Sequence, residues 1–426
     1  MDSPETILAR LFARTSKGIQ LGCGRMREAV GRLGNPHQFY HSVHVAGTNG
    51  KGSVCAYIDS ALRACGFRTA LFTSPHILRF EERFIINGSM ARLQDWLDVY
   101  AAIENIIEDM GLTFFEATTL IAFELFRRQG VQWAVFEVGL GGRLDATNII
   151  TPDVAVIATI GVDHTEYLGS DIVSIAREKL GIVKEKVPMV IADPDNPLVL
   201  EEARKACGRL HAPLTVARRN EISDIDRSGL STQFTYAGRR YTIPLQGSYQ
   251  PLNALCAIKA LEILRDCPQA GVAEGLANVR IPGRFQIVRI GQKTCVFDVG
   301  HNVQAFEGLV QSLAGNFPLK GICFVTGIMK DKDFSGMLNL VAKAAQAIIV
   351  TQPATDRACA AHTLAQYIPP SFCGDVLVVE DVGMAVETAF ARAEEIICIA
   401  GSFYTVGEAM RRLGVMPYPE KHNIGR

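Results

Sequence analysis

At 426 residues, 48% of them hydrophobic, the chain is globular and too long for one ordinary domain, so two domains are expected. Its formal net charge of −1 excludes a general electrostatic attraction to nucleic acid or to an anionic membrane. Eleven cysteines without a C-x-x-C pair, no apolar segment at the N-terminus and no uncharged apolar run of about 18 residues predict a cytoplasmic protein without membrane spans.

Short apolar runs alternate with amphipathic segments along the first part of the chain. The runs predict buried strands and the amphipathic segments predict helices. In chain order, the expected elements are a strand at Ser42–Val45, a helix at Lys51–Ala64, a strand at Arg68–Phe72, helices at Leu93–Asp109 and Glu116–Arg128, strands at Trp133–Phe136 and Val154–Ala158, and a helix at Asp171–Lys184. This alternation is typical of an α/β fold with a mostly parallel sheet flanked by helices.

A break in the pattern separates two domains. Thr232–Ile243 predicts a hairpin that turns at Ala237-Gly238 and forms an antiparallel edge to the first domain. A second alternating series follows Gly283, where proline and glycine interrupt the periodicity. Its expected strands are Cys295–Val299, Ile322–Thr326, Ala347–Val350, Val376–Val379 and Ile396–Ala400, with helices such as Val303–Leu313 and Asp381–Glu394 between them. We therefore expect a larger α/β domain over residues 1–283, with a P-loop-like segment after its first strand, and a smaller Rossmann-like α/β domain over residues 284–426.

The stretch HVAGTNGKGSVCAYI, from residue 44, is similar to a phosphate-binding loop with two departures from the usual G-x-x-x-x-G-K-[ST] pattern. Val45 stands at the first glycine position, and a glycine separates the lysine from the serine. Glycines between a strand and a helix let backbone N–H groups turn toward an anion, and the lysine adds a positive charge. The loop therefore predicts phosphate binding, without fixing the nucleotide, by Gly47, Thr48, Asn49, Gly50, Lys51, Gly52 and Ser53.

Two more polar groups follow apolar strands. Glu137 ends the run WAVFE, ahead of a glycine-rich segment, and His164 ends TIGVDH. Because the carboxyl ends of parallel strands meet at one edge of a sheet, both side chains are expected near the loop, where a nucleotide's metal ion binds. The alternatives are a strand-capping glutamate and a structural histidine. Lys179, in AREKLGIVK, has a helical spacing that by itself predicts a solvated surface lysine.

Together these motifs resemble the Mur ligase and folylpolyglutamate synthase superfamily, and its folate branch most closely. GTNGKGS is that branch's own form of the loop, and the similarity extends from about residue 33 to about residue 408. The resemblance implies that Gly50, Lys51 and Ser53 bind the phosphates of ATP and magnesium. It also implies that the serine of TSPH, Ser74, joins Ser53, Glu137 and His164 around Mg²⁺, with a second Mg²⁺ and a monovalent cation such as K⁺ as further expected ions.

Other assignments come only from the resemblance. Lys179 falls where the family often carries a carbamylated lysine, which gives it a catalytic role. QGSYQPLN is similar to a segment on the adenine side of the family's site, in which Asn253 matches and Tyr249 replaces a common histidine. Arg284, in PGRF, corresponds to an arginine at the interdomain hinge that reaches the ATP phosphates.

Two C-terminal motifs are similar to family elements as well. DVGHN, from Asp298, resembles D-G-A-H-N and implies a nucleotide-binding role for Asp298 and a catalytic role for His301. GSFY resembles an element whose serine, here Ser402, lies near the glutamate site. A core turn at Asp298 and a helix N-cap at Ser402 are the alternatives.

The reaction that the resemblance implies is ATP-dependent attachment of L-glutamate to a carboxylate through an acyl phosphate. The acceptors are dihydropteroate, which gives dihydrofolate, and tetrahydrofolate or folyl-glutamates, which are extended to polyglutamates. LTFFEAT and Asp145 are similar to segments that line the pterin site, and Phe115 or Phe114 can stack on a flat ring. A core aromatic pair is the alternative for the two phenylalanines.

Three other functions compete with this interpretation. The enzyme could be a folylpolyglutamate synthase alone. A cell-wall Mur ligase would need about a hundred residues of substrate-binding domain before the loop, on the family resemblance, whereas the loop begins at Gly47. A P-loop NTPase switch would hydrolyse ATP without glutamate. Small molecules are the expected partners, and we expect a monomer that binds neither nucleic acid nor membranes.

Overall fold

The computed structural model describes residues 3–18, 20, 22–169, 171–228, 231–317 and 321–418, which fold into two compact units. The first unit comprises Met1–Pro75, Glu81–Ile222 and Leu252–Val279. The second comprises His76–Phe80, Ser223–Pro251 and Arg280–Arg426. A domain boundary at residue 283 stays a prediction. Among the described residues, no helix has the length and apolar character needed to cross a membrane.

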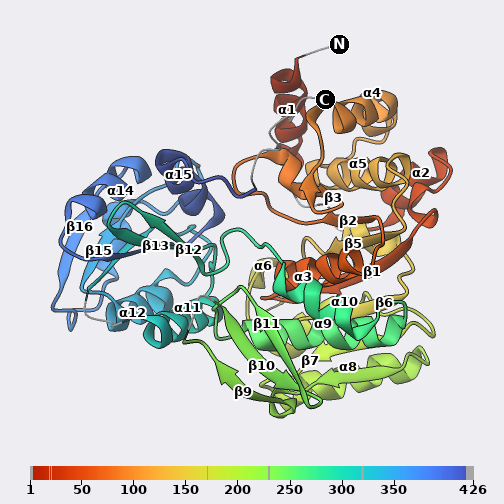
Figure 1. Cartoon of the computed structure of the whole chain (residues 1–426). Coiled ribbons are helices and arrows are strands. Elements are labelled where there is room, and N and C mark those ends of the chain that lie inside the picture. The colour runs from red at the N-terminus through yellow and green to blue at the C-terminus, as the bar shows by residue number, and fades with distance from the viewer. Residues whose placement is uncertain are drawn as a thin grey trace, which may run out of the picture. The chain divides into compact units, whose positions relative to one another are not determined.

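An eight-stranded sheet forms the centre of the first unit, with the strand order β4-β3-β2-β5-β1-β6-β7-β8 (Figure 1). Its strands are β1 (His41–Ala46), β2 (Thr69–Phe72), β3 (Phe84–Ile86), β4 (Ser89–Met90), β5 (Trp133–Glu137), β6 (Val154–Ile157), β7 (Met189–Ala192) and β8 (Leu214–Ala217). The six strands β2, β5, β1, β6, β7 and β8 run parallel to one another. Strand β3 is antiparallel to both of its neighbours, β2 and β4. The predicted mostly parallel sheet is confirmed.

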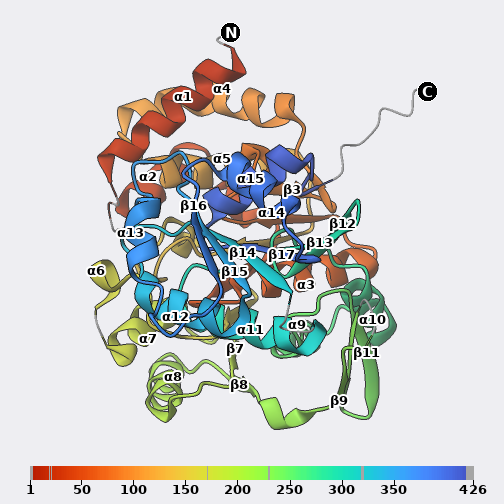
Figure 2. The same cartoon turned by 90° about the vertical axis from the view of Figure 1, so that its left-hand side faces the viewer.

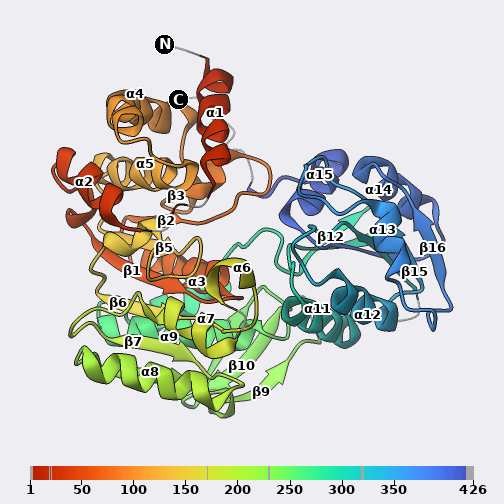
Figure 3. The ribbon, with the colours of Figure 1, turned by 180° about the vertical axis from the view of Figure 1, so that it is seen from behind.

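Helices cover both faces of this sheet because its parallel strands are apolar on both sides. The helices described for this part of the chain are α1 (Pro4–Ala13), α2 (Gly24–Arg32), α3 (Lys51–Ala64), α4 (Leu93–Asp109), α5 (Phe114–Arg128), α6 (Thr165–Leu168), α7 (Ile172–Leu180), α8 (Pro197–Arg209), α9 (Gln250–Leu264) and α10 (Gln269–Ala277). Helices α3 and α10 lie on the side that faces the viewer in Figure 1, and α6 and α7 lie on the side that faces the viewer in Figure 3. The predicted helices at α3 and α4 are confirmed over their whole lengths.

The hairpin predicted at residues 232–243 is confirmed, but its expected place in the fold is wrong. Strands β10 (Thr232–Tyr236) and β11 (Arg239–Ile243) pair with β9 (Ile222–Asp226) in a separate three-stranded sheet. The antiparallel edge of the large sheet is instead the β3–β4 hairpin, which turns at Asn87-Gly88. Both turn residues have positive φ, the conformation that favours Asn-Gly in two-residue hairpin loops.

A six-stranded sheet with the order β12-β13-β17-β14-β15-β16 forms the centre of the second unit. Its strands are β12 (Gln286–Ile290), β13 (Lys293–Asp298), β14 (Ile322–Thr326), β15 (Ala347–Val350), β16 (Asp375–Val378) and β17 (Ile396–Ala400). All neighbours are parallel except β12, which is antiparallel to β13. The predicted second α/β series is confirmed.

Two hydrophobic cores cover the two faces of this second sheet, whose strands β14–β17 are labelled in Figure 2. Along β14, Ile322 and Phe324 pack with α11 (Val303–Asn316), α12 (Phe334–Ala344) and α13 (Ala361–Gln366). The alternate residues of β14, Cys323 and Val325, pack with α14 (Val382–Ala391) and α15 (Phe403–Leu413). The side chains alternate because successive residues of a strand point to opposite faces.

Candidate active site

The predicted site residues of the first unit converge at one edge of its sheet. In the parallel register, Val45 pairs with Glu137, Ala46 with Ile157, and β2 runs beside β5 in the same direction. The carboxyl ends of β1, β2, β5 and β6 therefore lie together, and the loops after them carry the candidate residues. This is the edge at which open α/β sheets bind ligands.

Backbone and side-chain contacts hold the phosphate loop against the segment after β6. The Thr48 N–H donates to the Thr159 carbonyl at 2.7 Å, and the Thr159 hydroxyl donates to the Asn49 carbonyl at 3.0 Å. The Thr48 hydroxyl donates to the Gly161 carbonyl and accepts from the Gly161 N–H. Since its hydroxyl is engaged within the protein, Thr48 contributes to the loop by fixing its shape.

Gly50 needs to be glycine for two reasons. Its φ of +85° is a backbone conformation that residues with a Cβ avoid. A Cβ at this position would also lie 2.4 Å from Oδ1 of Asn253, which α9 brings against the loop. Asn253 thus lies beside the phosphate loop, and the predicted contact of its segment with the adenine side of a nucleotide stays a prediction.

Two lysine ammonium groups meet at one carbonyl of the loop. Lys51 Nζ donates to the Gly47 and Thr48 carbonyls at 3.0 Å, and Lys179 Nζ donates to the Gly47 carbonyl at 2.9 Å. Lys179 is 4% exposed, so the surface position expected from its helical spacing is wrong. Burial, together with the charge of Lys51, lowers the pKa of Lys179 from 10.5 to about 7. The ammonium of Lys51 beside backbone N–H donors suits a polyanion such as a triphosphate.

Glu137, the last residue of β5, is buried with its carboxylate turned toward α3 and the loop after β2. Its Oε2 accepts from the Ser74 N–H at 3.1 Å, and a Cβ at Gly52 would lie 3.5 Å from its Oε1. Ser53, in the first turn of α3, is buried beside Gly52. A carboxylate and hydroxyl groups are oxygen donors of the kind that divalent cations such as Mg²⁺ prefer. This part of the predicted metal site therefore fits a divalent cation.

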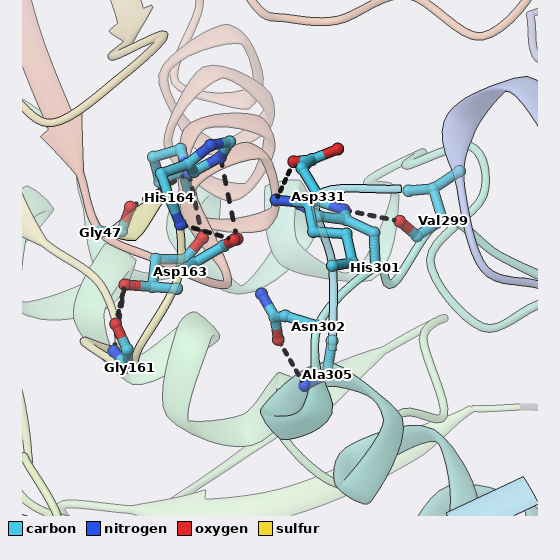
Figure 4. Close-up of polar contacts among 12 residues, drawn as sticks. Gly47, Gly161, Asp163, His164, Val299, His301, Asn302, Ala305 and Asp331 are labelled. Atoms are coloured by element: carbon cyan, nitrogen blue, oxygen red, sulfur yellow. Dashed lines mark hydrogen bonds and ion pairs between the residues drawn. The ribbon is translucent and has the colours of Figure 1, made fainter. Parts of the chain in front are cut away.

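His164 lies in the loop after β6 with a strained backbone. Its φ is +52°, which is uncommon for a residue other than glycine. The buried carboxylate of Asp163 accepts from the His164 N–H at 2.8 Å through Oδ1, and its Oδ2 lies 3.8 Å from His164 Nε2 (Figure 4). Strain at a loop of this kind is often retained at functional sites. The sequence prediction did not include Asp163, although its position directly before His164 was visible.

The two candidate stacking phenylalanines point to different surroundings. The Phe115 ring packs on the backbone of Gly139, where a Cβ would lie 2.4 Å from its Cζ, and it also contacts Phe72. Phe114 instead stacks on Phe12 of α1. Phe115 therefore lies next to the glycine-rich segment after β5, and of the two it has the better placement for an acceptor ring.

Asp145 organises the glycine-rich segment. One carboxylate oxygen accepts from the Leu140 N–H at 2.9 Å, and the other accepts from the backbone and the hydroxyl of Thr147. The hydroxyl of Thr147 also contacts Nε2 of the buried His44 at 2.8 Å. Burial raises the pKa of the Asp145 carboxyl, and its donors oppose this rise. Asp145 thus shapes the segment beside Phe115, while direct contact with a pterin stays a prediction.

The second unit holds Arg284 and His301 near one aromatic ring. The Arg284 guanidinium lies 5.5 Å from the centre of the Phe403 ring, and the His301 ring centre lies 6.1 Å from it. Nδ1 of His301 lies 3.1 Å from the Val299 carbonyl (Figure 4). Because a carbonyl only accepts, Nδ1 carries the proton, and Nε2 of a neutral ring can accept one.

Asp298 and Ser402 have well-defined structural contacts. The Ser402 hydroxyl accepts from the Thr405 N–H at 3.0 Å and so caps α15. The Asp298 carboxylate accepts from the Gly300 N–H within its own turn and from the Phe285 N–H of the loop before β12. The structural alternatives stated for these two residues are therefore present, and their ligand-binding roles stay predictions.

Comparisons with known proteins cover nearly the whole chain. Residues 45–261 match the Mur ligase middle domain, and residues 283–403 match the Mur ligase glutamate ligase domain. The dihydrofolate synthase/folylpolyglutamate synthase of Escherichia coli (strain K12) is 33% identical over 400 residues, which are 93% of this chain and 92% of the relative. The chain belongs to the dihydrofolate synthase/folylpolyglutamate synthase family.

Two solved structures of the family are similar to the chain along almost its full length. E. coli FolC in complex with DHPP and ADP has a TM-score of 0.86 and 31% identity, and the match covers 96% of this chain and 97% of that one. The bifunctional folylpolyglutamate synthase/dihydrofolate synthase with Mn, AMPPNP and L-glutamate bound has a TM-score of 0.85 and 31% identity, covering 97% and 98%. Both structures therefore hold a nucleotide, and the second also holds Mn and L-glutamate. The bifunctional folylpolyglutamate synthase/dihydrofolate synthase from Yersinia pestis c092, complexed with AMPPNP and Mn ion, also has a TM-score of 0.85 and 31% identity, covering 97% and 98%.

The lowered pKa of Lys179 predicts how replacing this lysine changes the stability of the protein. Lys179→Met is expected to raise the free energy of unfolding by about 3 to 5 kcal/mol at pH 7 and below, because a pKa unit corresponds to about 1.4 kcal/mol. The folded-state pKa of about 7 lies below the ordinary 10.5, so between these values the unfolded chain binds more protons and stability rises with pH. The gain should therefore disappear by about pH 10.5. Urea unfolding in carbon dioxide-free buffer at about pH 6, 8 and 10 measures it. A gain independent of pH would contradict a buried charge.

Proposed function

We propose that the protein is an ATP-dependent ligase that joins L-glutamate to dihydropteroate and to tetrahydrofolate or folyl-glutamates. The observation that carries the proposal is the meeting of Lys51, Lys179 and Glu137 at the phosphate loop. The proposed substrates are those of bifunctional relatives, to which the chain is similar over more than nine-tenths of its length. The product of the first reaction is dihydrofolate and that of the second is a polyglutamate.

The reaction needs an activated carboxylate, since a carboxylate oxygen is a poor leaving group. Transfer of the ATP γ-phosphoryl group to the acceptor gives an acyl phosphate, from which the glutamate amine displaces phosphate. A protein catalyses such a transfer mainly by positioning the reacting groups and by neutralising charge. Lys51 and the loop N–H groups supply positive charge at the phosphates. We assign Arg284 to the phosphates as well and His301 to catalysis, with Asp298 and Asn253 on the nucleoside side.

The metal ion is Mg²⁺ in this proposal, held by Ser53, Ser74, Glu137 and His164. When bound, it neutralises phosphate charge during the transfer. The Glu137 carboxylate provides the negative charge of the site, and its bond from the Ser74 N–H keeps it oriented. We also propose that a second Mg²⁺ and a monovalent cation such as K⁺ bind to the enzyme.

Lys179 is proposed to be carbamylated. A neutral amine attacks carbon dioxide, a C–N bond forms, and the amine proton leaves to solvent. The pKa of about 7 leaves roughly half of the amine neutral at neutral pH, so the residue is prepared for this step. The carbamate would exchange a positive charge for a negative one near the proposed metal ligands. Electron density extending beyond Lys179 Nζ in a crystal grown with bicarbonate would support the modification, and an unmodified amine would refute it.

The acceptor is proposed to bind beside Phe115, with Asp145 maintaining the segment on which its ring packs. Aromatic stacking suits a flat pterin ring. Ser402 is proposed to serve the glutamate site from the N-terminus of α15, where a helix end favours a carboxylate. We further propose that the enzyme works as a cytoplasmic monomer with small-molecule partners, consistent with its net charge of −1.

The test is release of ADP by the purified protein with Mg-ATP and L-glutamate, in parallel with dihydropteroate, with tetrahydrofolate and without an acceptor. Turnover with both acceptors is expected. Turnover with tetrahydrofolate alone would reduce the enzyme to a folylpolyglutamate synthase. Equal ADP release in all three reactions, independent of glutamate, would overturn the ligase and leave an ATPase.

A further inference from the structure

One buried carboxylate in the second unit ties together the backbone beside two proposed active-site residues. Asp298, the last residue of β13, is 3% exposed. Its Oδ2 accepts from the N–H of Phe285, which follows Arg284, at 2.9 Å. Its Oδ1 accepts from the N–H of Gly300, which precedes His301, at 2.7 Å. The position of this carboxylate therefore determines how both loops are held.

The loop that carries Arg284 needs such a restraint because its backbone is sterically unfavourable. Phe285 has a φ of +50°, although it is not a glycine. Gly283 has a φ of +63°, and a Cβ there would lie 2.9 Å from Cγ1 of Val299. The Val299 N–H donates to the Gly283 carbonyl at 2.8 Å, so β13 and its following turn hold the loop at two points. Without the carboxylate, Phe285 would lose the bond that opposes its relaxation to negative φ.

A third donor, the hydroxyl of Tyr249, fixes the carboxylate. It donates to Asp298 Oδ2 at 3.0 Å. The Tyr249 ring lies on two glycines, since a Cβ at Gly247 or at Gly308 would each lie 2.8 Å from a ring atom. Such close packing directs the hydroxyl to Asp298, and a bond to a charged acceptor is among the stronger hydrogen bonds of a protein.

Ser248, which precedes Tyr249, is held by contacts that do not involve Asp298. The Ser248 N–H donates to the Ser312 hydroxyl at 2.8 Å, and the Ser248 hydroxyl donates to the Gly308 carbonyl. These contacts attach the segment to α11 without involving Asp298. They provide a control that disturbs the same segment and leaves the carboxylate's donors in place.

We infer that Tyr249 is a positioning residue, which orients Asp298 through its hydroxyl and thereby fixes Arg284 for binding the ATP phosphates. The inference rests on the proposed function only for the role of Arg284. Phenylalanine retains the ring on Gly247 and Gly308 and removes the donor.

A double-mutant cycle tests the inference through binding of a non-hydrolysable ATP analogue with Mg²⁺, measured by calorimetry. Tyr249→Phe is expected to weaken binding about tenfold, the effect of losing a hydrogen bond to a charged group. In the Arg284→Ala background the same substitution should cost less than about twofold, because the residue through which it acts is gone. Ser312→Ala should leave binding unchanged within about twofold.

An equal loss from Tyr249→Phe in both backgrounds would overturn the inference, because the tyrosine would then act on the nucleotide directly or through Asp298, or on the fold, and not through Arg284. So would a tenfold loss from Ser312→Ala or unchanged binding by Tyr249→Phe. Thermal unfolding of each variant shows that the chains compared are folded. Binding does not require ligase turnover, so failure of the proposed function is recognised separately, as ADP release that does not depend on glutamate.

Discussion

Lys51→Ala is expected to lower kcat/KM for ATP, measured as glutamate-dependent ADP release, by roughly 10²- to 10³-fold. This loss corresponds to about 3 to 4 kcal/mol of transition-state stabilisation. The ammonium of Lys51 lies over the phosphate loop through its bonds to the Gly47 and Thr48 carbonyls. A positive charge fixed at this place stabilises the charge that develops on the transferred phosphoryl group. Gly47 keeps its bond from Lys179, so the loop should retain its shape in the variant.

Steady-state ADP release with saturating acceptor and glutamate measures the effect, and circular dichroism with thermal unfolding checks the fold. Lys205→Ala is the matched control, because Lys205 is an exposed lysine of α8 that pairs with Glu201 and Glu202. It should retain full activity. If Lys51→Ala failed to fold, Lys51 would have a structural role, and if it kept full activity, the phosphates would bind elsewhere.

Much of the fold follows from the sequence because its strands are short, apolar and buried on both faces. The runs ICFVT and AIIV predict β14 and β15 residue for residue, and Lys51–Ala64 predicts α3 in the same way. Such runs are bounded by glycine, proline or polar residues, so the local pattern contains the limits of the element.

Helix α9 was not predicted because it has no polar face. Its residues from Leu252 to Leu261 are all buried, so the sequence shows no helical alternation of apolar and polar positions. The β3–β4 hairpin was also missed, although Asn87-Gly88 between apolar residues is a strong local signal. The position of the β10–β11 hairpin could not be predicted, since the partner strand β9 has a mostly polar sequence.

Some features of the candidate site could likewise be predicted from the sequence, whereas others depend on the fold. The convergence of the loop, Glu137 and His164 follows from the direction of parallel strands and is therefore visible in the sequence. The burial of Lys179 depends on how α7 packs against Gly47, which no spacing within the helix reveals. The contacts of Tyr249 with Asp298 join residues 49 positions apart, and only the fold brings them together.

Glu137→Gln is expected to raise the Mg²⁺ concentration needed for half-maximal ADP release and to lower kcat/KM by roughly 10²- to 10³-fold at moderate Mg²⁺. The substitution keeps the shape of the side chain, and its amide oxygen can still accept from the Ser74 N–H. It removes the negative charge that the proposed metal ion needs, so the loss should concern the metal more than the fold. Titration of ADP release with Mg²⁺ and with Mn²⁺ measures the change.

Glu124→Gln serves as the matched control, because Glu124 is a buried carboxylate of α5 that bonds only to arginines, Arg127 and Arg128, among the contacts described for its side chain. It should lose stability by roughly 1 to 3 kcal/mol and leave the Mg²⁺ dependence unchanged. An unaltered Mg²⁺ dependence in Glu137→Gln would exclude Glu137 as a metal ligand. A shift of equal size in both variants would assign the effect to the loss of a buried charge, and the metal site would then have to be sought among other residues at this edge of the sheet.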